Sequence, residues 1–298
     1  MKKGVIAAII AAAAVIIGAL AAYNHFNSTP PGVAGNTVSK MQKLNSVRGE
    51  LIADYDGTIS YMGIGVDIGV DADLEVQILT GEHMRSHETG TVTIEALGFS
   101  YPVALENYAL QEEDGFTSYI NLQKGKWLRH HGTGTESEKT ESFDSTKFVL
   151  GMIQKIMKGE IKAETSKETE MLGDREVRRM DVHFSGPALQ DLVTSASEYG
   201  EFELPEDLDL TEASADITVF VDKKTGDPAE FRFDCTALGN VMMKRMTGNQ
   251  DWDGEAKSFT LTFRFNEFDT LESLEVPAHI TENAIDVENL NILDGILN

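Results

Sequence analysis

The sequence predicts an α+β fold in which one strongly curved antiparallel β-sheet carries a few helices. The clearest signal is residues 215–237, where apolar and polar residues alternate along two arms on either side of a turn at Gly226 and Pro228. A period of two on both arms is typical of a β-hairpin with one buried face. Similar patterns recur at residues 116–129 and 259–276. Glycines that would bend a sheet interrupt the first strand-like region, at positions 57, 63, 65 and 69.

Residues 1–22 predict a signal peptide or an N-terminal transmembrane signal anchor. Two lysines precede an uncharged run of Ala, Ile, Val, Leu and Gly, close to the length of about 20 residues that spans a bilayer. The lysines keep the N-terminus in the cytoplasm, so the rest of the chain is expected to be exported. The domain is then membrane-anchored, or secreted if the leader is cleaved after Ala21 or Ala22.

The globular part is expected to be a single domain over residues 37–286. Residues 23–36 are rich in Asn, Ser, Pro and Gly and predict a flexible tether. A short helix follows over residues 37–47, and residues 48–106 have the alternation of several strands. Residues 136–142 are polar and charged and predict a loop.

The strongest helix signal lies at residues 144–158, which Gly159 ends. Its apolar residues fall on one face at helical spacing: Phe148, Val149, Met152, Ile153, Ile156 and Met157. Such a face predicts a helix that lies against the sheet.

The second half of the chain returns to strands with shorter helices between them. Residues 161–185 have strand alternation, and Pro187 begins a second helix that is expected to extend to about Tyr199. Residues 201–216 are acidic and predict an extended, solvated segment. Residues 241–246 predict a short helical or irregular link, and residues 287–298 a tail with a short docking helix.

The charge excludes one large class of function. The chain of 298 residues has 49 acidic and 25 basic residues, a net charge of −24, and 41% apolar residues. Nucleic-acid binding needs clustered Lys and Arg, so no nucleic-acid partner is expected, and anionic lipid surfaces are disfavoured. The only cysteine, Cys235, allows neither an intramolecular disulfide nor a thiolate metal site, and is expected to be a small buried apolar residue.

Catalytic and metal signals are weak, so no catalytic residue, cofactor or metal site is predicted. Asn249, Asp251 and Asp253 imitate the start of a calcium loop, but Thr260 stands where such a loop needs a bidentate Glu. Calcium binding there stays an open alternative to an acidic turn. Four histidines in two pairs lack a third ligand at a diagnostic spacing and are expected in exposed loops: His83, His87, His130 and His131.

A helix over a concave sheet could enclose a lipid-sized cavity. The same apolar residues could equally fill an ordinary core, and the sequence leaves both interpretations open. The candidate lining residues come from the helix and from the inward rows of the strands: Phe148, Met152, Ile153, Ile156, Ile217, Val219, Val221, Phe231, Phe233 and Phe263.

The order of several short motifs resembles the LolA-like superfamily, especially its Gram-positive LppX/LprG-type and related uncharacterised exported members. The motifs are the leader, the helix carrying KMQKLNSV, Tyr119 with Lys126-Trp127, the Lys-rich helix, ITVFVDKKTGDP at 217–228, FNEFD at 265–269 and LEVP at 274–277. The resemblance covers about residues 37–286. It implies a half-barrel of antiparallel strands with helices over the open side, and several such proteins carry lipids or lipoproteins. This chain lacks the acylated Cys of the lipoprotein members.

Two functions therefore remain in view. The first is an exported, non-enzymatic monomer that binds a hydrophobic ligand such as lipid, or serves as a cell-envelope carrier. The second is a cell-surface structural or protein-interaction module with a filled core and an acidic exterior. A hydrolase is a remote third alternative.

Overall fold

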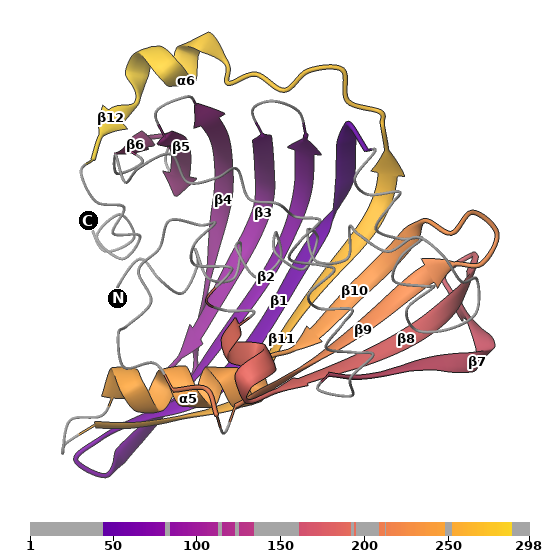
Figure 1. Cartoon of the computed structure of the whole chain (residues 1–298). Coiled ribbons are helices and arrows are strands. Elements are labelled where there is room, and N and C mark those ends of the chain that lie inside the picture. The colour runs from indigo at the N-terminus through magenta and orange to yellow at the C-terminus, as the bar shows by residue number, and fades with distance from the viewer. Residues whose placement is uncertain are drawn as a thin grey trace.

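The protein is built around one large, open, curved sheet of twelve strands (Figure 1). The strands follow the order β12-β6-β5-β4-β3-β2-β1-β11-β10-β9-β8-β7. The computed structural model describes residues 44–80, 84–112, 115–122, 125–133, 161–191, 194, 209–211, 213–247 and 252–287. The elements are β1 Ser46–Tyr61, β2 Ile64–Leu79, β3 Arg85–Ala96, β4 Phe99–Glu112, β5 Gly115–Leu122, β6 Trp127–Thr133, β7 Lys162–Leu172, β8 Arg175–Ser185, β9 Ser214–Asp222, β10 Pro228–Asp234, α5 Thr236–Thr247, β11 Trp252–Phe268, α6 Ala278–Asn283 and β12 Ile285–Asp286.

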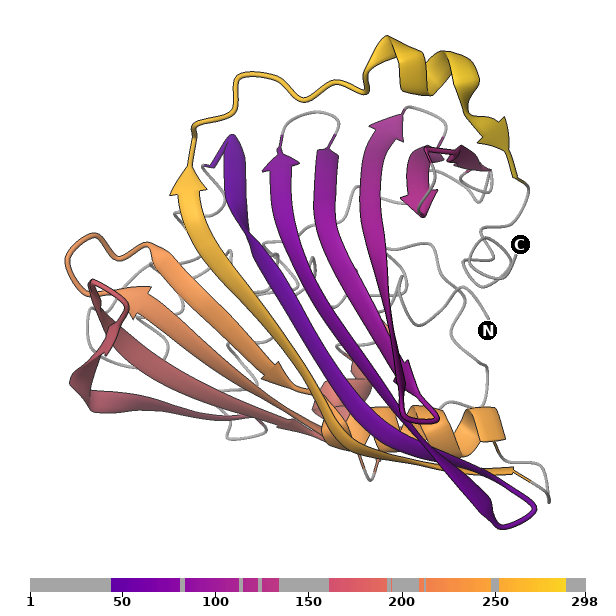
Figure 2. The same cartoon turned by 180° about the vertical axis from the view of Figure 1, so that it is seen from behind.

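The sheet is mixed, which corrects the prediction of a purely antiparallel sheet. Strands β1 to β6 pair antiparallel in chain order, as do β7 to β11, and β1 pairs antiparallel with β11. Only β12 pairs in parallel, with β6, through Ile285 opposite Leu128. The parallel pair arises because the chain leaves β11, crosses the strand ends and returns to the far edge of the sheet (Figure 2). The curved, half-open sheet expected from the sequence is confirmed.

Alternation along the strands gives the sheet two unlike faces. On the inner face, Leu51 of β1 lies opposite Leu74 of β2 and Phe263 of β11, and Phe263 lies opposite Phe231 of β10. Phe231 in turn lies opposite Val219 of β9. Each fully buried side chain of this size contributes about 1.5–3 kcal/mol to folding, so this apolar row is the main core of the domain.

Aromatic rings fill the centre of that core. The ring of Phe265 meets the ring of Phe231 edge to face with centroids 4.8 Å apart, and the ring of Phe263 at 4.7 Å. Phe233 stands next to Phe231, also edge to face. Offset and edge-to-face pairs of this kind stabilise a core beyond the area that they bury.

Helix α5 packs on the inner face at the end of the sheet where β11 begins. The side-chain amide of Asn240 accepts a hydrogen bond from the backbone N–H of Ala256 and donates one to its carbonyl. Gly239 allows the close approach, because a Cβ there would stand 3.3 Å from the Cβ of Ala256. The link expected at residues 241–246 is thus part of a twelve-residue helix.

The C-terminal segment, residues 269–287, forms a strap across the strand ends. Its start is fixed by Asp269, whose carboxylate accepts hydrogen bonds from the N–H groups of Asn45 and Ser46. Ile280 of α6 then packs in a second, smaller core with Trp127, Tyr108, Tyr119 and Leu274 on the outer face. The strap ends at β12, where Asp286 accepts two hydrogen bonds from the Arg129 guanidinium.

The outer face carries many acids and one fully buried carboxylate. Glu230 on β10 has no exposed surface, and the guanidinium of Arg264 donates to it from Nε at 2.7 Å. Arg232 also pairs with Glu230 and lies over the ring of Phe220. Phe220 lies on the outer face and is buried there with Val177.

Several predictions concern residues that the structure does not describe. The leader, the tether and residues 37–43 of the first helix lie among residues 1–43, and the helix at 144–158 lies among residues 134–160. The predicted end of the first helix is wrong, because Ser46 and Val47 already belong to β1. Residues 187–191 are helical, as expected. The prediction that residues 201–216 form an extended, solvated segment is wrong at Leu210, which is buried in the main core. Within the described residues, no helix is both long and apolar enough to cross a membrane.

Candidate functional site

The structure places six of the ten predicted lining residues together on the inner face. They belong to a single buried cluster and none is more than 6% exposed: Ile217, Val219, Val221, Phe231, Phe233 and Phe263. The other four lie outside the described residues: Phe148, Met152, Ile153 and Ile156. The six pack in the core, and we call them the Phe block; their role as a cavity lining stays a prediction.

A strip of half-exposed apolar side chains continues the inner face beyond this block. We call Val66, Ile68 and Val70 of β2, together with Ile94 of β3, the apolar stripe; all four are partly exposed. Val70 lies directly opposite Ile94 in the ladder. Because alternate residues share one face of a strand, the stripe lies on the same side as Leu74 in the buried cluster.

The inner face ends in two hairpin turns that expose large apolar residues. The β1–β2 turn carries Tyr61, Met62 and Ile64, and the β3–β4 turn carries Leu97, Phe99 and Tyr101; we call these six residues the tip patch. Met62 is 68% exposed and Leu97 is 72% exposed. In Figure 2 the β1–β2 turn extends past α5 at the lower right.

Both turns place a bulky residue where the backbone favours Asn, Asp or Gly. Met62 and Gly63 have φ of 49° and 80°, and Leu97 and Gly98 have φ of 55° and 77°. Positive φ at both central residues defines the type I′ hairpin turn. A non-glycine side chain in this region costs roughly 1–2 kcal/mol, and neither Met nor Leu can recover it through the local hydrogen bonds that Asn makes.

A polar cluster interrupts the apolar surface on the inner face of β3, β4 and β5. Asn107 donates a hydrogen bond from Nδ2 to the Glu88 carboxylate and accepts one at Oδ1 from the Ser118 hydroxyl, at 2.8 Å. Glu88 lies opposite the buried Val76. Burial raises the pKa of the Glu88 carboxyl, although hydrogen bonds from Ser86 and Asn107 act in the opposite direction. The cluster therefore places a carboxyl group and an amide together on an otherwise apolar face.

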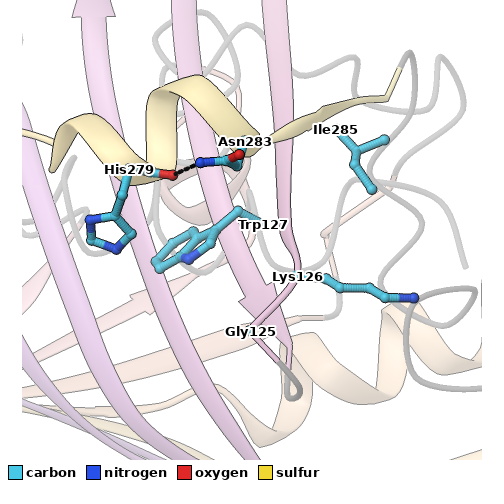
Figure 3. A pocket seen from close by; sticks show the side chains of 6 residues that line it. All are labelled: Gly125, Lys126, Trp127, His279, Asn283 and Ile285. Carbon is cyan, nitrogen blue, oxygen red and sulfur yellow. Dashed lines mark hydrogen bonds between the residues drawn. The ribbon is translucent and has the colours of Figure 1, made fainter.

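A separate pocket of about 430 Å³ opens between the β5–β6 turn and α6 (Figure 3). The indole of Trp127 forms its wall, while Lys126, His279, Asn283 and Ile285 surround it. Asn283 donates a hydrogen bond to the carbonyl of His279, which holds the rim. None of the six predicted lining residues that the structure describes lines this pocket.

The described histidines and Cys235 lie in separate parts of the fold. The prediction of loop positions is wrong for His87, His130 and His131, which lie in β3 and β6, although His131 is exposed as expected. His83 is outside the described residues. His87 stacks on Tyr108 with ring centroids 4.1 Å apart. Cys235 is buried, and burial raises the pKa of its thiol to about 12. The described part of the chain contains no group of three or more His, Cys, Asp or Glu that could hold a metal ion.

Comparison with known proteins gives structural likenesses only. No family model and no curated protein matches the chain. Among solved structures, lipoprotein LppX from Mycobacterium tuberculosis is 7% identical with a TM-score of 0.38, and 80% of this chain and 94% of that chain are covered. A DUF1329 family protein from Desulfovibrio piger is 10% identical with a TM-score of 0.23, over 80% of this chain and 92% of that one.

A third structure, an outer membrane lipoprotein-sorting protein domain from Vibrio parahaemolyticus, is 11% identical with a TM-score of 0.21. That alignment covers 76% of this chain and 87% of the other. The proteins found include the LppX type that the order of sequence motifs resembles.

The tip patch and the polar cluster were missed by the sequence reasoning. For the tip patch a signal existed, because residues 57–66 and 96–105 are two uncharged stretches in a chain with 25% charged residues. For the polar cluster there was none, because Glu88, Asn107 and Ser118 meet only through the register of three strands.

Proposed function

We propose that this protein is an exported, non-enzymatic protein that binds a hydrophobic ligand, a lipid acyl chain, on the inner face of its sheet. The observation that carries the proposal is the continuity of the apolar surface from the buried Phe block to the half-exposed stripe. An acyl chain laid along Val70 and Ile94 would cover side chains that are otherwise partly in water. Each buried CH₂ group contributes about 0.8 kcal/mol to such binding.

The polar cluster gives this site its orientation. Ligand sites are mostly apolar with a few placed polar groups, and Glu88 with Asn107 supplies such a pair next to Val76. Burial raises the pKa of the Glu88 carboxyl, and this group and the Asn107 amide are the polar groups nearest the head of a ligand chain that lies on the stripe. We therefore place the polar end of the lipid near Glu88 and its chain on the apolar stripe.

The location and the lack of enzymatic activity belong to the same proposal. The leader of residues 1–22 directs the domain outside the cytoplasm, where it stays anchored or is released. The Cys235 thiol is unsuited to nucleophilic chemistry, because its pKa is raised to about 12 and its side chain is buried.

One observation favours the second candidate, a surface interaction module with a filled core. The six predicted lining residues that can be placed are packed against one another, with Phe231 and Phe265 in edge-to-face contact. In that case the half-exposed stripe would be ordinary surface and the acidic outer face would meet a protein partner or an envelope polymer.

Native mass spectrometry of the full chain, purified from a membrane-containing host, separates the two. We expect wild-type protein to carry lipid. Ile94→Glu should lose it because a charge would then stand in the middle of the stripe. Thr91→Glu is the matched control, since Thr91 is exposed on the opposite face of the same strand. Lipid-free wild-type protein that also takes up no fluorescent fatty acid would overturn the proposal in favour of the interaction module.

A further inference from the structure

We infer that the tip patch inserts into the interface of a zwitterionic lipid bilayer, so that a lipid can pass between the membrane and the apolar stripe. The inference rests on the proposed function for the identity of the transferred ligand. The insertion itself rests on the tip patch alone.

The first support is the unfavourable backbone conformation of Met62 and Leu97, whose side chains make no contact within the described part of the fold that would offset it. Met62 and Leu97 adopt positive φ at the position where a type I′ turn prefers Asn or Asp, and both side chains remain largely exposed. At Asp269, a third non-glycine residue with positive φ, the carboxylate instead caps the N–H groups of Asn45 and Ser46. Backbone strain that no internal contact explains points to a role outside the fold.

The second support is the distribution of charge around the tips. The ten residues 57–66 and the ten residues 96–105 contain no charged residue on either face of their strands. Acidic residues return at Asp56, Asp67 and Glu95. On the neighbouring strand β11, the exposed Asp253 and Glu255 lie opposite Ser60 and Thr58, so acids also border the β1–β2 turn on that side. An uncharged end bordered by acids fits a neutral surface, whereas anionic lipid would repel it.

The third support is the choice and shape of the side chains. Tyr61 and Tyr101 stand next to the apolar Ile64 and Phe99, and tyrosine is enriched where one end of a ring is apolar and the other is wet. The pairing of Ile68 with Ala96 makes the β1–β2 turn extend four residues beyond the β3–β4 turn, roughly 13 Å at 3.3 Å per residue. Two hairpin turns that end at different heights can both insert into a lipid bilayer, whereas a flat protein surface would contact only the longer one.

The tip patch is also continuous with the proposed ligand site. Ile64 lies on the same face of β2 as Val66 and Ile68, because these residues alternate along one strand. Phe99 and Tyr101 lie opposite Ala96 and Ile94 on that same inner face. A lipid leaving the bilayer at the tips would therefore meet apolar side chains all the way to the Phe block.

The test uses a fluorophore next to the tip patch. Ser100→Cys, an exposed position between Phe99 and Tyr101, is labelled with a polarity-sensitive probe, while buried Cys235 stays unlabelled. Asp174→Cys in the β7–β8 turn, at the other end of the strands, is the control for anchoring through residues 1–22. With phosphatidylcholine vesicles we expect a blue shift at position 100 and quenching by lipids spin-labelled close to the headgroup, and neither change at position 174.

Paired substitutions then test the two turns directly. Met62→Asn with Leu97→Asn should abolish the blue shift at position 100, yet leave the fold at least as stable because Asn suits both turns. Met171→Asn removes another exposed methionine, 64% exposed near the β7–β8 turn, and should leave the shift unchanged.

Three results would overturn the inference. The first is a probe at position 100 that remains in a water-like environment with vesicles. The second is a blue shift that appears without vesicles and grows with protein concentration. The third is a stronger blue shift with phosphatidylglycerol than with phosphatidylcholine. A blue shift without vesicles would mean that another copy of the chain covers the tip patch. Lipid detected by native mass spectrometry in the same sample shows that the proposed function stands even where membrane insertion fails.

Discussion

Glu88 and Asn107 lie side by side on neighbouring strands of the inner face, joined by a hydrogen bond from the Asn107 amide to the Glu88 carboxylate. This pair places an ionisable group on an otherwise apolar surface, beside the proposed ligand site. Its titration can be followed without knowledge of the ligand.

We predict that the free energy of unfolding falls as the pH rises above the ordinary range of a glutamate. Burial raises the pKa of Glu88 in the folded state, so the folded protein binds more protons than the unfolded chain between the two pKa values. Stability from this group is present below the unfolded pKa, about 4.3, and is lost as the pH rises through the folded value. Urea unfolding between pH 4 and 8 measures the slope.

The variants isolate the contribution of this one carboxyl. Glu88→Gln should flatten the decline, whereas Glu75→Gln, on an exposed outer-face position of β2, should retain it. An unchanged slope in Glu88→Gln would show that other groups cause the pH dependence.

A second prediction concerns the fully buried Glu230. Glu230→Gln removes the carboxylate that pairs with Arg264 and Arg232. Both guanidinium groups are half-exposed, so hydrogen bonds to water offset part of the lost interaction energy. We expect a loss of about 1–3 kcal/mol in the free energy of unfolding, below the 3–5 kcal/mol of a pair buried on both sides. Glu50→Gln, which removes a 3.5 Å contact with Arg264, should cost at most about 1 kcal/mol. Equal losses in the two variants would contradict this ranking.

The third prediction separates the Phe block from the apolar stripe. Phe231→Ala removes a ring with 1% exposure and should lower stability by about 3–5 kcal/mol. Val70→Ala, at a partly exposed position, should cost about 1 kcal/mol or less and instead reduce the amount of bound lipid. Thermal melting and native mass spectrometry on the same samples measure both effects, and the prediction is wrong if Val70→Ala destabilises as strongly as Phe231→Ala.

The strap gives a fourth prediction. Ile280 is 2% exposed and packs in the core that contains Trp127, so Ile280→Ala should cost about 2–4 kcal/mol locally. Hydrogen exchange should then rise in β6 and β12 but not in β9 and β10, which belong to the other core. Thr281→Ala is the matched control on the same helix. Uniform acceleration across the sheet would show that the two cores unfold as one unit.

The turn residues give a fifth prediction, on stability alone. Met62→Asn and Leu97→Asn relieve positive φ in a bulky residue, and each should raise the free energy of unfolding by up to about 1 kcal/mol. Chemical denaturation measures the change. A loss of stability would mean that the two side chains contribute to the fold.

The strand hairpins could be predicted from the sequence because their signals are local. Ile217, Val219 and Val221 alternate without a break, and Gly226 has the positive φ expected of a turn glycine. The pairing of Phe263 with Phe231 extends that hairpin into the sheet. Alternation of apolar and polar residues is sufficient to assign these faces.

The rest depends on contacts between distant segments. The parallel pairing of Ile285 with Leu128 follows from the path of the strap, which no local pattern encodes. In the same way, Glu88 meets Asn107 only once the register of β3 and β4 is known. The prediction that His87, His130 and His131 lie in loops was wrong, because the spacing of histidines does not indicate which strand carries them.

Photo-crosslinking with a diazirine-labelled fatty acid, followed by peptide mapping, tests the central claim most directly. If a lipid acyl chain lies on the inner face, the label should attach to peptides from residues 64–70 and 94–103, and Ile94→Glu should remove it while Thr91→Glu does not. Labelling confined to the Trp127 pocket of Figure 3, or labelling that Ile94→Glu leaves unchanged, would contradict the account.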